Sequence, residues 1–250
     1  MNVDPLTAPA VVLAAAVIPA YIGLFMALLM VKRIGARFTR YAASVASGIS
    51  FALFFDLVAN ASGLGLNLAS RASITQAIFI GSFLVGILVL FTLDARTSDR
   101  VSVPTFLVYI ISLGISFHSI AEGIVVGYDI RTAGFSDELS TIVQGLSFAL
   151  HKAAEGFVIG SFFTKQSRLS NGIFAGAIAS LPGVLGASLG AFGIPGIVSS
   201  YLFAMGAGAT IYMITKLIPV AVSGKSNITV AMGIALGYLF IYGAGLIHNI

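Results

Sequence analysis

The chain has 250 residues, of which 58% are hydrophobic and only 9% are charged, and its formal net charge is +4. Soluble domains carry roughly 25% charged residues, and a mean hydropathy of +1.04 excludes that class. The composition predicts an integral membrane protein in which residues 1–250 form a single transmembrane domain. Cysteine is absent, which excludes disulfides and thiolate metal ligands.

Charged residues divide the chain into apolar stretches long enough to cross a bilayer, which takes about 20 helical residues. The first five predicted spans cover residues 9–31, 41–68, 74–93, 103–127 and 139–164. Residues 170–215 carry no charge and are too long for one span, so we expect two there, with a turn near residues 193–195. Residues 227–247 form the last. The predicted fold is all-α with eight transmembrane helices, and the first is expected to be retained because its sequence lacks a basic leader.

The basic residues outside the spans predict the orientation of this bundle. Only Arg71 and Arg131 follow even-numbered spans, whereas nine follow odd-numbered ones: Lys32, Arg33, Arg37, Arg40, Arg96, Arg100, Lys165, Arg168 and Lys225. By the positive-inside rule the nine face the cytoplasm, so both termini are expected on the extracytoplasmic side, most simply of the plasma membrane. Topology explains the positive charge, and no nucleic-acid partner is expected.

Two similar phrases, SFHSIAEGIVVG and ALHKAAEGFVIG, occur in the fourth and fifth predicted spans. They place His118 four residues before Glu122, and His151 four residues before Glu155. Residues four apart share one face of a helix, so each span presents an imidazole beside a carboxylate. Facing each other, the two helices would form a four-ligand metal site. The alternative is a structural network of buried polar groups.

Depth and spacing suggest how such a site would be reached. At about 1.5 Å per residue, His118 and His151 are predicted to lie roughly 14–18 Å from the outer surface, near the middle of the bilayer. Gln144 and Ser147 precede His151 and Glu155 along one face of the fifth span. This polar stripe predicts an access path for the metal. Hydrogen bonding between helices is an equally good interpretation of the stripe.

HSIAEG and HKAAEG resemble the paired metal motifs of the ZIP (Zrt/Irt-like) divalent metal transporters, and FALFFDLVA and FAMGAGATIYMITKLIPVA resemble that family's second and seventh helices. The resemblance implies inward transport of zinc or a similar ion, and a 3+2+3 helix arrangement with inverted repeats. It also implies roles for particular residues. The primary ligands would be His118, Glu122, His151 and Glu155, with Ser119 as a weaker ligand and Asp56 on the metal path.

The sequence departs from the family pattern at Lys152, where members with two metals have an acidic ligand. A lysine repels a second cation, so one metal is expected, with the ammonium replacing the missing ion between Glu155 and Glu122. Many relatives also have a proline where this chain has Ala121 and Ala154. A proline kink is therefore not expected in either motif helix.

Imidazole and carboxylate ligands suit zinc, iron(II), manganese, cobalt, nickel and cadmium. We expect one of these ions to be the transported substrate. No catalytic cofactor and no enzymatic activity are expected. Low pH is expected to weaken its binding, because imidazole binds metal only when deprotonated. The other expected partner is membrane lipid, with a homodimer left open. Two rival interpretations remain: an intramembrane zinc-dependent hydrolase, and a carrier of organic solutes that needs no metal.

Overall fold

The structure, a computed structural model, describes residues 6–63, 74–97, 103–133, 138–164, 167–194, 196–223 and 227–248. Nearly all of these residues are helical and none lies in a strand, which confirms the all-α prediction. In chain order the elements are α1 (Thr7–Val12), the π-helical segment η1 (Leu13–Val17), α2 (Ile18–Ile34), α3 (Ala36–Gly63), α4 (Ile74–Thr97), α5 (Val103–Ala133), α6 (Glu138–Ser161), α7 (Leu169–Ala191), α8 (Gly196–Val222) and α9 (Asn227–His248).

The first three elements form one continuous apolar helix. Pro19 lies two residues after the end of η1. A proline cannot donate a backbone hydrogen bond to the carbonyl four residues earlier, and its ring clashes with that carbonyl. The wider π-helical turn accommodates this interruption without a break in the helix. The helix ends at Gly35, whose φ of 79° suits glycine and whose N–H donates to the carbonyl of Val31.

Seven helices of the described residues are long and apolar enough to span a membrane, which supports the prediction of an integral membrane protein. They match seven of the eight predicted spans, except that residues 64–68 of the second lie outside the described residues. The uncharged stretch does hold two helices, of which the first ends at Ala191 and the second begins at Gly196. The remaining helix, α6, has 24 residues and is about 36 Å long. It is too polar to qualify by composition because Gln144, His151 and Lys152 interrupt its apolar sequence.

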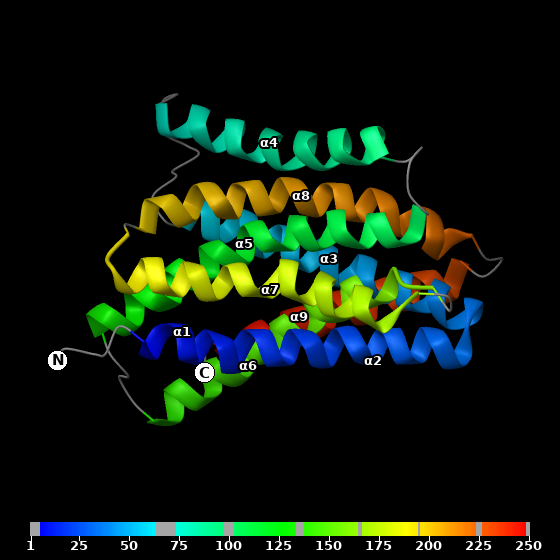
Figure 1. The fold of residues 1–250 in the computed structure, drawn as a ribbon, viewed down its shortest axis with the longest axis horizontal. Helices are drawn as coiled ribbons and strands as arrows, with labels where there is room; N and C mark the ends of the chain where they lie inside the picture. Colours follow the sequence, from blue (N-terminus) through cyan, green and yellow to red (C-terminus); the bar gives the residue numbers. More distant parts are fainter. Residues whose placement is uncertain are drawn as a thin grey trace.

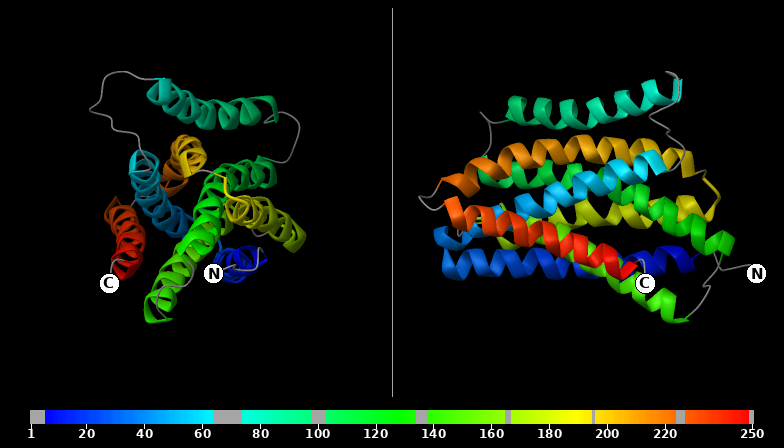
Figure 2. Two further views of the ribbon diagram at one scale, coloured as in Figure 1. Left: turned by 90° about the vertical axis from the view of Figure 1, so that its left-hand side faces the viewer. Right: turned by 180° about the vertical axis from the view of Figure 1, so that it is seen from behind.

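The helices form an elongated bundle in which α1 begins and α9 ends toward the same end (Figures 1 and 2). A chain that crosses the membrane an even number of times must have both termini at the same end. Which compartment that end faces remains a prediction. The most extensive packing joins α5 to α7, α3 to α8 and α9, and α2 to α6. These pairs do not by themselves divide the bundle into 3+2+3 groups, so that arrangement also stays a prediction.

Glycines set the rotation of the two motif helices. Gly123 and Gly156 each follow the glutamate of a motif, and neither has room for a Cβ. The backbone of α7 occupies that space at Gly123, and the carbonyl of Ala20 in α2 occupies it at Gly156. Because these glycines hold the backs of α5 and α6 against α7 and α2, the faces with the imidazoles and carboxylates turn into the bundle.

Helix α4 lies at the edge of the bundle and packs mainly on α8 (Figure 1). Gly86 and Gly208 make the two backbones approach closely, and an ion pair of 2.5 Å joins Lys216 to Asp94 near the ends of the two helices. The outward surface of α4 is apolar and exposed, including Leu88. In a membrane this surface would face lipid.

Candidate metal centre

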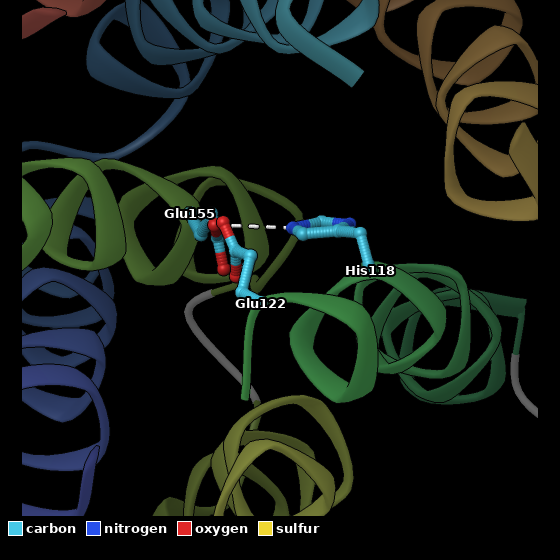
Figure 3. Close-up of side chains that lie close together, drawn as sticks. All are labelled: His118, Glu122 and Glu155. Carbon is cyan, nitrogen blue, oxygen red and sulfur yellow. Dashed lines mark ion pairs between the residues drawn. The ribbon is translucent and has the colours of Figure 1, made fainter. Parts of the chain in front are cut away.

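The two motifs meet where α5 and α6 come together near their midpoints. His118 and Glu122 project from α5, and Glu155 projects from α6 toward them (Figure 3). Each of these three residues offers one ligand atom, and the three atoms lie within 4.8 Å of one another. Ligands at about 2.0–2.2 Å from a shared ion lie roughly 3–4 Å apart. The described side chains are therefore close to the separation that one metal ion requires.

Glu155 links both histidines. Its Oε1 lies 3.1 Å from Nε2 of His118 and 3.1 Å from Nε2 of His151. His151 Nε2 also lies 3.6 Å from Oε1 of Glu122. All four residues predicted from the sequence thus belong to one cluster, with the Glu155 carboxylate between the two imidazoles.

The cluster is deeper on one side than on the other. His118 and Glu155 are 0% and 2% exposed, whereas His151 and Glu122 are 15% and 13% exposed. Neither ring nitrogen of His118 makes a well-aligned hydrogen bond with any described residue. Burying an imidazole without such a partner is costly, and a metal ion at Nε2 would supply the missing interaction. Gly206 of α8 provides the space for this ring, because a Cβ there would lie 2.7 Å from Cβ of His118.

Lys152 supplies a positive charge inside the cluster. Its Nζ lies 2.8 Å from each carboxylate oxygen of Glu155 and pairs with Glu122 as well. It also donates a hydrogen bond of 3.4 Å to Oγ of Ser119 and lies 5.7 Å from the ring centre of Phe148. The ammonium therefore occupies the predicted position between the two carboxylates. With neutral imidazoles, the cluster has one net negative charge.

A cavity of about 600 Å³ reaches the cluster from one end of the bundle. Glu122 and His151 line its inner part, and its other walls come from the halves of α3, α5, α6, α8 and α9 that lie toward the start of α1. Toward the opposite end, the described side chains pack into an apolar core that includes Ile115, Ile159 and Met213. Among the described residues, the cavity therefore reaches the candidate site from the end at which α1 begins, and an apolar core lies on the other side.

The other predicted site residues lie at different places around the cavity. Asp56 and Ser147 line it, whereas Gln144 is exposed near the start of α6 and is not among the described lining residues. Ser147 donates a hydrogen bond of 2.6 Å to the carbonyl of Ala244 in α9. Ser147 therefore makes the hydrogen bond between helices that one interpretation of the polar stripe predicts. It also lines the cavity, whereas a path for metal stays a prediction. Ser119 contacts Lys152, so the predicted weak ligand accepts a hydrogen bond from the ammonium.

Sequence reasoning missed two features, one at the cavity and one between α4 and α8. One is the set of aromatic rings around the cavity, which belong to Phe55, Phe148, Phe203, Tyr238 and Tyr242. The other is Asp94 as the partner of Lys216. The sequence did hold a signal for that pair. A lysine at membrane depth, such as Lys216, requires a partner, and Asp94 lies one residue beyond the predicted end of the third span. The rings had no such signal, since aromatic residues are common throughout apolar spans.

No protein-family model matches this sequence, and a search of curated proteins found no match. The resemblance to ZIP transporters therefore rests on the motifs themselves.

Proposed function

We propose that the protein transports a divalent transition-metal cation across a membrane through the cluster of His118, Glu122, His151 and Glu155. The observation that carries the proposal is the convergence of two imidazoles and two carboxylates at the inner end of a cavity. Nitrogen and oxygen ligands select zinc and its neighbours, including iron(II), manganese, cobalt, nickel and cadmium. By resemblance to ZIP transporters, zinc is the first choice, transport is inward, and the membrane is the plasma membrane.

Transport by such a site requires alternating exposure, because one location must open first to one side and then to the other. The cavity on one side and the apolar packing on the other correspond to one of these two states. The resemblance implies that the motif helices shift against the rest of the bundle. The ion gradient or the membrane potential would drive net movement.

Lys152 supports a site for one ion. The ammonium contacts both glutamates, where a second divalent ion would otherwise bind. A cation at the imidazoles of His118 and His151 would remain compatible with it, because the carboxylates separate the positive charges. We therefore propose one metal per chain.

The direct test is uptake of a panel of divalent metals into proteoliposomes. The His151→Ala variant is expected to lower metal affinity by at least about 100-fold, more than is typical for residues that only orient a ligand. His248→Ala is the matched control, because His248 is the one histidine outside the two motifs. Two results would contradict the proposal. In one, His151→Ala leaves saturable uptake intact; in the other, His151→Ala and His248→Ala reduce it equally.

The same preparation separates the rival functions. An intramembrane hydrolase would bind metal tightly and cleave substrates without net uptake. A carrier of organic solutes would contain no metal, with Lys152 and the glutamates available to the solute. Metal analysis of the purified protein, together with a hydrolytic assay, distinguishes these cases from metal transport.

Ser147 tests the access path. Ser147→Leu is expected to reduce the initial rate of metal uptake severalfold, because the larger side chain would project into the cavity between the opening and His151. Ser147→Ala is the control, since it removes only the hydrogen bond to Ala244. If the alanine variant loses as much uptake as the leucine variant, the hydroxyl matters for packing and the path hypothesis fails.

A further inference from the structure

The cavity is far larger than a metal ion requires. A volume of about 600 Å³ corresponds to about twenty water molecules at about 30 Å³ each, and it lies within the range of small-molecule sites. Its walls are also unlike those of a purely aqueous path. Its described lining includes apolar residues of α3, α5 and α9 and the aromatic rings of Phe55, Phe148, Phe203, Tyr238 and Tyr242.

The charge of the cavity is negative. Asp56 and Glu122 line it, and neither lysine nor arginine occurs among its described lining residues. Glu122 pairs with Lys152 at the inner end. The carboxylate of Asp56, on the exposed wall of α3, has no ion-pair or hydrogen-bond partner among the described residues. An unpaired carboxylate among aromatic rings is the combination that recognises organic ammonium ions, because the faces of the rings attract cations and also provide apolar contact.

We propose that this cavity binds an organic monocation with an apolar or aromatic body, whose ammonium pairs with Asp56 and whose body lies against the aromatic rings. Such a ligand would occupy the opening through which His151 is reached. It would bind whether or not the protein transports metal, so the proposal does not rest on the function proposed above. A free amine and the choline headgroup of a lipid share this chemistry.

The test uses the absence of tryptophan from the chain. Tyr242→Trp places a fluorescent reporter in the cavity, and Phe174→Trp places one on the exposed surface of α7 as the control. With the full chain in nanodiscs, benzyltrimethylammonium is the probe and neopentylbenzene is its uncharged analogue. Saturable quenching is expected from the cavity reporter alone, with affinity for the cation about tenfold higher than for the analogue. Tyr238→Trp is the second cavity reporter should the first variant not fold.

Asp56→Asn in the reporter background is expected to weaken binding of the cation about tenfold and to leave binding of the uncharged analogue unchanged. Equal affinity for the two probes, no effect of Asp56→Asn, or quenching of both reporters alike would overturn the proposal. Nanodiscs of phosphatidylcholine and of digalactosyldiacylglycerol distinguish the sources. If the probe binds more weakly in phosphatidylcholine than in digalactosyldiacylglycerol, the choline headgroup competes for the cavity and is an occupant. If the probe binds equally in the two lipids, the occupant is a free cation. Either result requires the site at Asp56.

Discussion

Glu155→Gln is expected to abolish saturable metal uptake and to lower zinc affinity by at least about 100-fold. Glu155 is 2% exposed, and its Oε1 lies 3.1 Å from both histidine Nε2 atoms, so it joins the imidazole of one motif to the imidazole of the other. Glutamine preserves the volume but removes the charge that would offset a buried cation. Breaking a buried charge pair typically costs roughly 3–5 kcal/mol, which corresponds to a change in affinity of at least about 100-fold.

The affinity would be measured by competition with a chelating zinc indicator, and uptake in proteoliposomes with the same preparation. Glu138→Gln is the matched control, because it makes the same substitution at the first residue of the same helix, seventeen residues before Glu155. It is expected to retain native affinity. If Glu155→Gln binds zinc as tightly as the native chain, the cluster is a structural network of polar groups and the metal site is refuted.

Lys152→Glu is expected to raise the metal content from one ion to two per chain. The substitution replaces an ammonium that contacts Glu122 and Glu155 with a third carboxylate at the same place. Three buried carboxylates repel one another, and a second divalent ion would relieve that repulsion. Without metal the variant is expected to be less stable than the native protein by about 3–5 kcal/mol, because a buried charge has lost its partner.

Metal content would be measured by elemental analysis of protein purified in zinc and then passed over a sizing column. Lys152→Met is the control, since it removes the charge without adding a ligand, and its metal content is expected to remain at one ion. A content of one ion in Lys152→Glu would refute the idea that the ammonium replaces a second metal.

Local patterns in the sequence were sufficient for the all-α class, for seven of the eight spans and for the choice of candidate ligands. The turn predicted near residues 193–195 coincides with the end of α7 at Ala191 and the start of α8 at Gly196. Each pair of candidate ligands shares a helix face, and that depends only on a spacing of four residues. The one helix that fails as a span by composition, α6, carries half of those ligands.

Other features depended on how the helices rotate and approach one another. Spacing along one helix could not reveal that Glu155 Oε1 is shared by both imidazoles, or that Lys152 reaches Ser119 on α5. The same holds for the cavity walls, because Phe203 and Tyr238 come from helices that carry neither motif. Contacts between separate helices decide these distances, and a sequence pattern describes one helix at a time.

By itself, the sequence determined that this is a helical membrane protein and which four side chains are its candidate metal ligands, because hydropathy and helical spacing act over a single span. The tertiary structure alone decided that Gly123 and Gly156 turn both motifs inward, that Lys152 lies between the carboxylates, and that a cavity reaches the site. The physical reason is that side-chain packing and backbone contact between helices distant in the chain fix their relative rotation and depth.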